Sequence, residues 1–343
     1  MKATRRNGPV RVAVVGCGEI SRAHLRAIQA NEPSLVEVAG VFDQSAERAR
    51  ARATEFSVER IYDSWEDVRG QSDIDVVALL LPHDVHARFT IEALEAGHHV
   101  VVEKPMGTSI DECDQMIESA LKAGKQLRPV HNRIYDPGTD AVKEFIQGGA
   151  IGEVFLAQTL GLEPPRTVSV RPWLGTKAGG GGVLLAQAVH PAYILRTVLG
   201  EVSEVTCITS QRKVVDMTAE DTAVAIYRFE SGALAEMTGT FGLPIGPNEH
   251  RITFYGPDGF VEISSARGIN ALSEKHYGDR LQHALLEDPE WGTGFRRLWT
   301  DYAHGFAEGT PTRVTAEDGK RAVEMILGAY KSAEERRTVT LPL

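Results

Sequence analysis

Cysteine is scarce in this sequence, which has three among 343 residues, at positions 17, 113 and 207. An odd number of widely spaced cysteines fits neither a disulfide framework nor the paired CxxC spacing of a zinc knuckle. Thiols without such a pattern are typical of proteins from a reducing compartment, so we expect a cytoplasmic protein.

Positive charge is also in short supply: 37 lysines and arginines stand against 47 aspartates and glutamates, for a formal net charge of −10. General binders of nucleic acid or of anionic membranes need a basic surface, so we expect neither partner. Long apolar runs are missing as well. The first such run, Val12–Val15, ends at Gly16 and is too short for a signal-peptide core or a membrane span.

The sequence does contain enough apolar residues, 42% of the total, to form sizeable hydrophobic cores. Its length is more than twice the roughly 150 residues of an average domain, so we expect two domains. Short apolar runs predict strands at 10–15, 36–42, 75–81, 99–103 and 126–130. Helices are predicted between them at 20–30, 45–56, 84–96 and 110–123. This alternation predicts a parallel sheet covered on both faces.

The pattern changes after about residue 131. A glycine-rich segment at 178–182 precedes a helical stretch at 183–199, and another helix at 317–333 closes the chain. Between these helices, β-type runs occur at 203–213, 222–229, 233–240, 251–255 and 260–264. Hairpin signals join several of these runs, which predicts a separate, mainly antiparallel sheet.

A glycine-rich loop, GCGEIS at 16–21, follows the first strand and opens the first helix. Gly16 permits a tight turn, and Gly18 lets the backbone approach a pyrophosphate at the N-terminus of the helix. Ser21 stands where the usual fingerprint has a third glycine or alanine. A plain tight turn is the alternative, but the strand–loop–helix context favours dinucleotide binding.

Two polar residues follow predicted strands at the edge where open α/β sheets bind ligands. Asp43 ends the second strand, where a carboxylate accepts the ribose hydroxyls of NAD and repels the extra phosphate of NADP. Gln44 and Ser45 follow it with no arginine beside them, so we favour NAD over NADP; the alternative role of Asp43 is a helix N-cap. Lys104 follows the strand at 99–103 and could stabilise a developing alkoxide, or it could be a solvated loop lysine.

Several ordered motifs together resemble the glucose–fructose oxidoreductase/inositol dehydrogenase (Gfo/Idh/MocA) family. They are GCGEISRAH (16–24), LPHDVH (81–86), VVEKP (101–105), HNRIYDP (131–137), the glycine-rich helix (178–200) and the closing helix and strand (318–342). The resemblance implies a Rossmann domain over 1–131 and an α/β domain over 132–343 with a large open, mainly antiparallel sheet. It also implies NAD(P)-linked redox chemistry on a sugar, glycoside or cyclitol, and a homo-oligomer, dimer or tetramer.

The resemblance further implies a catalytic pair, Lys104 and His190, in which His190 exchanges the proton of a secondary alcohol while hydride passes to nicotinamide. The cofactor-binding residues expected by resemblance and position are Gly16, Gly18, Glu19, Ile20, Asp43, Leu81, His83, His86, Glu103 and Lys104. Candidates for a sugar-binding wall are Arg133, Tyr135, Arg171 and Trp173, with core packing or surface ion pairs as the alternative. His83, His86, His98 and His99 have no acidic or cysteine partners at ligand spacing, so we expect no metal.

The glycine-rich helix departs from the family pattern. Ala186 stands where the family commonly has Asp or Asn, one helical turn before His190. Gln187 is therefore a candidate replacement for substrate contact, and Pro191 is expected to kink the helix. The resemblance also leaves open a redox-neutral NAD-dependent glycosidase or lyase and a cyclic dihydrodiol dehydrogenase, and the loss of a polar group at Ala186 favours the second of these. The same loss leaves open a catalytically impaired nucleotide-binding regulator or partner subunit.

Overall fold

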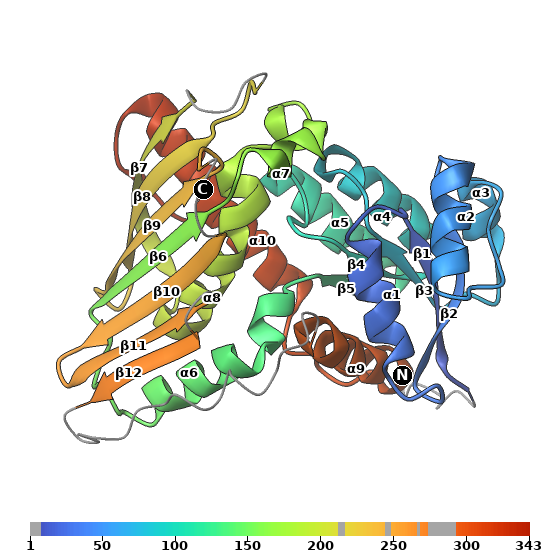
Figure 1. Ribbon diagram of the computed structural model, residues 1–343, viewed down its shortest axis with the longest axis horizontal. Helices are drawn as coiled ribbons and strands as arrows, with labels where there is room; N and C mark the ends of the chain where they lie inside the picture. Colours follow the sequence, from blue (N-terminus) through green and yellow to red (C-terminus); the bar gives the residue numbers. More distant parts are fainter. Residues whose placement is uncertain (1–7, 212–216, 244–247, 266–267, 274–292) are drawn as a thin grey trace. The chain divides into compact units, whose positions relative to one another are not determined.

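A computed structural model describes residues 8–211, 217–243, 248–265, 268–273 and 293–343 (Figure 1). The chain divides into two compact units. The first unit comprises residues 1–135 and 290–320, and the second comprises residues 136–289 and 321–343. Residues 290–320 thus return the chain to the first unit. No helix or strand was expected for most of this segment.

The first unit is built on a five-stranded parallel sheet in the order β2-β1-β3-β4-β5. Its strands are β1 (Val10–Val15), β2 (Val36–Phe42), β3 (Val76–Leu79), β4 (His99–Val102) and β5 (Leu127–Pro129). The strands are nearly continuous valine-rich runs that are buried on both faces, as parallel strands require. This observation confirms the predicted doubly covered parallel sheet.

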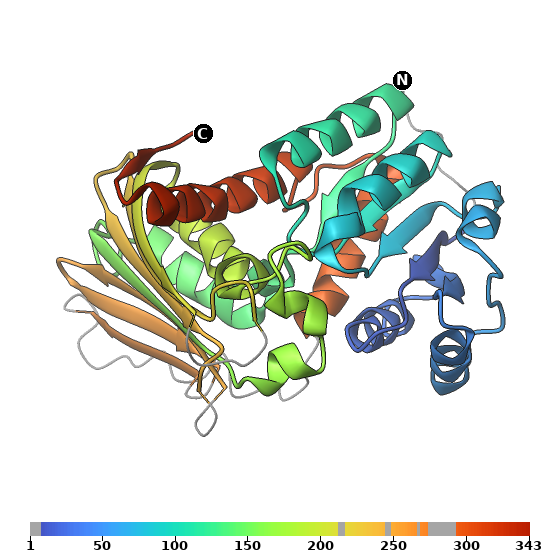
Figure 2. The ribbon, with the colours of Figure 1, turned by 90° about the horizontal axis from the view of Figure 1, so that it is seen from above.

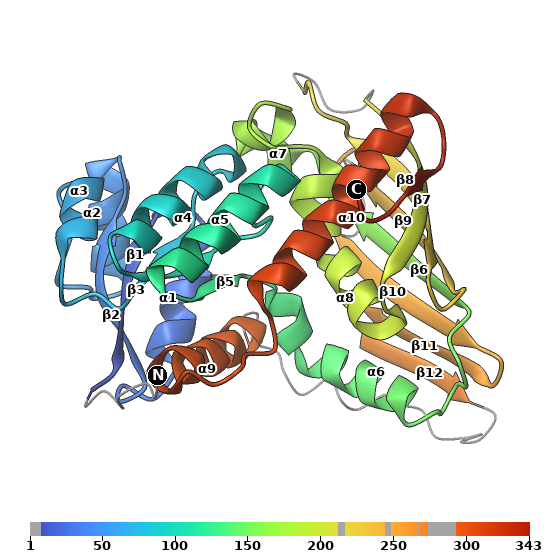
Figure 3. The same cartoon turned by 180° about the vertical axis from the view of Figure 1, so that it is seen from behind.

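Helices cover both faces of this sheet. They are α1 (Ser21–Gln29), α2 (Ala46–Glu55), α3 (Trp65–Gly70), α4 (His86–Glu95), α5 (Ile110–Ala123) and α9 (Thr293–Glu308), with short 3₁₀ turns at His83–Val85 and Asn132–Tyr135. Helices α4 and α5 pack side by side on one face (Figure 3), and α1 packs against α9 on the other. Ser45, Ser64 and Ser109 cap α2, α3 and α5 by accepting hydrogen bonds from backbone N–H groups in the first turn.

The second unit contains an eight-stranded sheet in the order β12-β11-β10-β6-β9-β8-β7-β13. Its strands are β6 (Leu156–Leu162), β7 (Val202–Ser210), β8 (Thr222–Phe229), β9 (Leu234–Thr240), β10 (Glu249–Gly256), β11 (Gly259–Ser264), β12 (Gly268–Ser273) and β13 (Val339–Thr340). Only β6 and β9 pair in parallel among these described strands. The predicted mainly antiparallel sheet is therefore confirmed.

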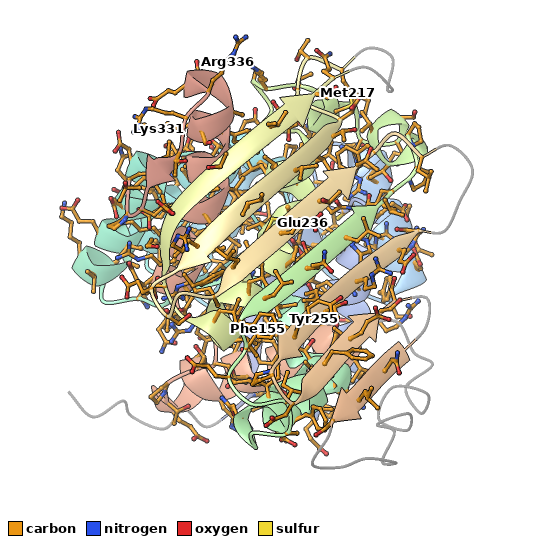
Figure 4. The ribbon with its side chains drawn as sticks, turned by 90° about the vertical axis from the view of Figure 1, so that its left-hand side faces the viewer. Phe155, Met217, Glu236, Tyr255, Lys331 and Arg336 are labelled. Carbon is orange, nitrogen blue, oxygen red and sulfur yellow. The ribbon has the colours of Figure 1, made fainter. Side chains whose placement is uncertain are left out.

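One face of the eight-stranded sheet carries the helices of the second unit (Figure 2). These include α8 (Val189–Leu199) and α10 (Ala316–Glu335), and α6 (Pro137–Gln147) contacts β11 and β12. Short helical pieces are α7 (Arg166–Ser169) and a 3₁₀ turn at Pro172–Gly175. The other face, from which Glu236 and Tyr255 project, is not covered by any helix of the described chain (Figure 4).

The helix predicted at 183–199 consists of two segments. A π-helical turn, Leu184–Ala188, precedes the α-helix α8. Pro191 is the third residue of α8 and directly follows this π-helical turn. A proline lacks the N–H that a regular helix uses, which agrees with an irregular turn just before it. The kink expected at Pro191 stays a prediction.

None of the helices in the described ranges combines the length and apolar character needed to cross a membrane.

Candidate active site

The dinucleotide loop connects β1 to α1. Gly16 adopts φ +99, and a Cβ atom there would lie 2.3 Å from the carbonyl oxygen of Leu80 and 3.3 Å from the Leu81 side chain. A Cβ atom on Gly18, by contrast, would have no neighbour within 4 Å. Gly16 is therefore required by close backbone packing, whereas Gly18 leaves the open approach that a pyrophosphate needs. The loop fits a dinucleotide on both counts.

Ser21, the departure from the fingerprint, has a local role in this loop. Its hydroxyl is fully buried and donates a 2.6 Å hydrogen bond to the carbonyl oxygen of Gly18. Glu19 and Ile20, the other expected loop residues, lie at the entrance to α1. The Glu19 carboxylate is exposed and pairs with Arg22 at 2.6 Å, while Ile20 is the N-cap residue of α1.

Asp43 follows β2 and anchors three parts of the chain. One carboxylate oxygen accepts the N–H of Cys17 in the dinucleotide loop at 2.9 Å. The other accepts the N–H of Ser45 and a guanidinium N–H of Arg48, both at 2.8 Å. Burial alone would raise the pKa of Asp43, but the hydrogen bonds from Arg48, Cys17 and Ser45 outweigh it and lower the pKa. Asp43 is thus a held, ionised acceptor.

The contacts of Arg48 show that two expectations from the sequence were wrong. We expected no arginine beside Asp43, because the two residues that follow it are Gln44 and Ser45. Arg48 lies in the first turn of α2, and its guanidinium pairs with Asp43 at 2.8 Å. The N-cap of α2 is Ser45, whose hydroxyl accepts the N–H of Arg48, so Asp43 is not the cap.

A cavity of about 520 Å³ lies beside Asp43, between the N-termini of α2 and α3. Its lining includes the carboxylates of Asp43, Asp63 and Glu66, the Arg50 side chain and the Trp65 ring. Carboxylates outnumber cations in this lining, so the cavity suits a neutral group with hydroxyls better than a further phosphate.

The Glu103-Lys104-Pro105 turn follows β4 and is held by a buried hydrogen-bonded chain. Trp299 on α9 donates its indole N–H to Nδ1 of His24 at 3.1 Å. His24 therefore carries its own proton on Nε2, which lies 3.0 Å from one oxygen of Glu103. The second oxygen of Glu103 accepts the backbone N–H of Lys104 at 3.0 Å. Trp299, His24 and Glu103, from three separate parts of the sequence, thus fix the backbone that carries Lys104.

The ionisation of Glu103 follows from these contacts. Burial raises the pKa of this carboxyl, but the hydrogen bond from His24, together with the charge and the backbone N–H of Lys104, more than compensates, so the pKa is lowered. Both oxygens of Glu103 are engaged inside the first unit, and a direct cofactor contact by Glu103 stays a prediction. His24 and Trp299 were not recognised as functional in the sequence, apart from the place of His24 in the GCGEISRAH motif.

His83 and His86 lie in the segment that joins the carboxyl end of β3 to α4. The fully buried ring of His86 is 2.8 Å from the carbonyl oxygen of Pro105 and 2.9 Å from that of Leu81. Burial lowers the pKa of His86, although the carbonyl oxygens of Pro105 and Leu81 act in the opposite direction. The His83 ring is also buried and lies 5.7 Å from that of His86. No cluster of three potential metal ligands is found among the described residues.

The proposed sugar-binding wall is divided between the units. Tyr135 is 1% exposed, and its hydroxyl donates a 2.6 Å hydrogen bond to Asp301 in the first unit. These contacts are those of a core residue, and substrate contact by Tyr135 stays a prediction. Arg133 is half-buried in the same unit, while in the second unit Trp173 is half-buried and Arg171 is exposed.

In the second unit, Gln187 packs against the eight-stranded sheet. Its carboxamide lies over Gly161 and Gly239, which are paired on β6 and β9; a Cβ atom on Gly161 would approach its oxygen to 2.5 Å. This position is internal, and substrate contact by Gln187 stays a prediction. His190 is half-buried, whereas the nine residues before it are all buried.

Glu220 fixes the start of the segment that carries His190, a role not apparent from the sequence. Its carboxylate accepts the N–H of Leu184 at 2.9 Å and the hydroxyl of Tyr330 at 2.8 Å. A Cβ atom on Gly182 would come within 2.3 Å of the same carboxylate, which explains one glycine of the glycine-rich segment. Burial raises the pKa of Glu220. Lys104 and His190 belong to different units, and their catalytic pairing stays a prediction.

A parallel sheet with a glycine-rich loop after its first strand and an acidic acceptor after its second defines a dinucleotide-binding Rossmann fold. Residues 10–131 match the oxidoreductase family described by its NAD-binding Rossmann fold, and residues 143–341 match the C-terminal α/β domain of the same family. The chain belongs to the Gfo/Idh/MocA family of NAD-dependent oxidoreductases. The expectations of this family, of a Rossmann fold and of NAD as cofactor are thereby confirmed.

Relatives match nearly the whole chain. Myo-inositol 2-dehydrogenase of Thermotoga maritima is 26% identical over 337 residues, which cover 97% of this chain and 98% of that protein. The structure is similar to that of a WlbA dehydrogenase from Chromobacterium violaceum in complex with NADH and UDP-GlcNAcA, with 26% identity, a TM-score of 0.85, and coverage of 100% of this chain and 99% of that one. A levoglucosan dehydrogenase complex with NADH and levoglucosan shares the fold at 22% identity, with a TM-score of 0.87 and coverage of 98% and 100%.

Proposed function

We propose that the protein is an NAD-dependent dehydrogenase that transfers hydride between nicotinamide and a secondary alcohol, or its ketone, in a sugar, glycoside or cyclitol. The observation that carries this proposal is Lys104 at the carboxyl end of β4, on a backbone held by the Trp299–His24–Glu103 chain. The relatives named for myo-inositol and levoglucosan oxidation support the substrate class.

Each of the candidate residues has its own role in this proposed reaction. Bound NAD supplies the hydride acceptor, and Gly16, Gly18 and Asp43 hold it. The Lys104 ammonium donates a hydrogen bond to the substrate oxygen and stabilises the alkoxide that forms there. His190 takes the hydroxyl proton while the carbon gives up hydride, and in the reverse direction it returns that proton. Ala186 provides no polar group one turn before His190, which favours a substrate with fewer hydroxyls on that side.

The same geometry supports NAD over NADP. The pKa of Asp43 is lowered, so this residue would meet a ribose as a carboxylate, and charged residues in the lining of the cavity beside it are mostly acidic. A ribose phosphate would meet this negative charge, although Arg48 partly balances it.

A substrate panel tests the proposal. The purified protein is incubated with NAD and myo-inositol, levoglucosan, related sugars or a cyclic dihydrodiol, and free NADH is measured together with each product. Accumulation of NADH with a ketone product is expected. Product formation without free NADH would instead identify the redox-neutral glycosidase or lyase, and the absence of turnover throughout the panel in a protein that binds NADH would favour the regulator.

We also propose that the protein is a cytoplasmic homo-oligomer. The three thiols are unpaired and buried, as expected in a reducing compartment. The uncovered face of the eight-stranded sheet exposes Ile208 on β7 at 76% and Ile226 on β8 at 52%, with Val224, Leu234 and Leu272 on the same sheet. Apolar side chains grouped on a sheet face favour contact with a second copy. Light scattering should give a multiple of the chain mass for the wild type and a smaller mass for Ile226→Glu.

A further inference from the structure

Arg52 on α2 is a buried cation behind the dinucleotide loop, and the mechanism above does not use it. Its side chain is 7% exposed. One terminal nitrogen donates to the carbonyl oxygens of Cys17 at 3.2 Å and Gly18 at 3.1 Å. The other terminal nitrogen pairs with Glu55 on the same helix. Arginine is suited to this position because its planar fork presents several donors in fixed directions.

These contacts set the orientation of the loop peptides. In a trans peptide, the carbonyl oxygen and the N–H of the next residue point in opposite directions. When the carbonyls of Cys17 and Gly18 point toward Arg52, the N–H groups of Gly18 and Glu19 must point away from it. The side of the loop away from Arg52 thus presents N–H groups in place of carbonyl oxygens, which is the arrangement that binds phosphate.

Other donors complete the restraint. The Gly18 carbonyl also accepts the Ser21 hydroxyl at 2.6 Å, and the N–H of Cys17 is held by Asp43 at 2.9 Å. Ser21 and Arg52 therefore act on the same carbonyl oxygen from two helices.

The effect of Arg52 depends more on the direction of its hydrogen bonds than on the net charge of the residues around it. Glu55 pairs with both Arg52 and Arg22, and Arg22 also pairs with Glu19. The two arginines and two glutamates of this group have no net charge, so the cluster adds little overall attraction for an anion. What the guanidinium contributes is two hydrogen bonds to the loop carbonyls.

We propose that Arg52 is a positioning residue for the NAD pyrophosphate, acting through the carbonyls of Cys17 and Gly18 together with Ser21. The inference rests on the NAD binding of the proposed function, but not on its substrate or on Lys104. Without Arg52, these peptides can rotate and turn a carbonyl oxygen toward the phosphate, which weakens cofactor binding. The chemistry at Lys104 should be unaffected once the cofactor is bound.

The test is NADH affinity, measured by fluorescence titration of the full-length protein. Arg52→Met should raise the NADH Kd about tenfold, equal to about 1.4 kcal/mol, and raise the KM for NAD by a similar factor. The kcat at saturating NAD should stay within about twofold of the wild type. Arg52→Lys keeps the positive charge but loses the planar guanidinium with its fixed donors. Its NADH Kd should therefore lie nearer that of Arg52→Met than that of the wild type.

Two further variants complete the design. Arg26→Met removes an exposed arginine from the last turn of α1 and should leave the NADH Kd unchanged. Ser21→Ala removes the second donor to the Gly18 carbonyl and should raise the Kd in the same direction, so the test survives if Arg52→Met fails to fold. A purely structural role would lower the melting temperature without changing the Kd in the folded protein. If Arg52→Met binds NADH as tightly as the wild type, the inference is overturned but the proposed function stands. If Arg52→Met does not fold, the same outcome in Ser21→Ala overturns the inference. A wild type that does not bind NADH would overturn both.

Discussion

Replacing Trp299 by phenylalanine tests whether the buried chain behind Lys104 controls its position. Trp299 is 0% exposed, and its indole N–H is the donor to Nδ1 of His24 at 3.1 Å. The substitution leaves this buried nitrogen without its donor, at about 1–3 kcal/mol, and the smaller ring leaves a void that costs about 1 kcal/mol more. We therefore expect a loss of about 3 kcal/mol in the free energy of unfolding, or about 6–12 °C in Tm.

Trp299→Phe should also disturb the position of Lys104. With Nδ1 unpaired, the proton of His24 is no longer confined to Nε2, and Glu103 loses its donor in part of the molecules. The turn that holds the Lys104 N–H then loosens, and we expect kcat to fall about tenfold. NADH affinity should change little, because the dinucleotide loop is held by other residues.

The variant should also alter the pH dependence of stability. The pKa of Glu103 is lowered in the folded protein, so its contribution to stability is present above its unfolded pKa and is lost as the pH falls through its folded pKa. Loss of the His24 hydrogen bond brings the folded pKa closer to the ordinary value. Acid unfolding of Trp299→Phe should therefore begin at a higher pH than that of the wild type.

A matched control is available in the same unit. Trp65 is also buried, and its indole N–H donates to Glu92 at 2.5 Å, away from the Lys104 turn. Trp65→Phe should lower Tm but preserve kcat at saturating NAD, because Trp65 lies beside the proposed cofactor cavity and not beside Lys104. Equal kcat values in Trp299→Phe and the wild type, with unchanged acid unfolding, would refute the reasoning about the buried chain.

Two other predictions concern the carboxylates. Asp43→Ala removes the ribose acceptor and releases Arg48, so kcat/KM for NAD should fall about 10–100-fold while relative activity with NADP rises. Glu95→Ala, which removes an exposed carboxylate at the end of α4, is the control. An unchanged NAD/NADP ratio in Asp43→Ala would contradict the role of Asp43. Glu220 has a raised pKa in the folded protein, so the stability associated with its protonated form is full below its unfolded pKa and is lost as the pH rises toward its folded pKa. Glu220→Gln retains an oxygen acceptor for Leu184 and Tyr330 and should be at least as stable as the wild type at pH 8 by denaturant unfolding. A large loss of stability at that pH would show that the charge of Glu220 is needed.

The parallel sheet could be predicted because its strands are short, continuous apolar runs between helices. Asp43 and Lys104 could be located for the same reason, since each directly follows such a strand. Helix α9 was missed because Gly294 and Gly305 interrupt its apolar pattern and its buried face is completed only by packing on α1. Strand β6 was missed because Gln158 and Gly161 weaken a segment whose stability comes from pairing on both edges.

The unpredicted parts of the site depend on contacts between distant positions. The Trp299–His24 hydrogen bond joins residues 275 positions apart, and no local pattern indicates it. Arg48 and Arg52 lie in a helix rich in alanine and charge, where the sequence does not distinguish an exposed arginine from one that reaches a loop. The folded backbone decides this, because Arg48 meets Asp43 and Arg52 meets the loop carbonyls.

The central claim is that this family member transfers hydride with Lys104 acting on the substrate oxygen. The most direct measurement compares wild type and Lys104→Met for NADH formation at saturating NAD with a substrate from the panel, with the NADH Kd of both proteins determined in parallel. The account predicts that kcat falls about 10²–10⁴-fold while Kd changes little. Wild-type turnover by Lys104→Met with unchanged NADH binding would contradict it.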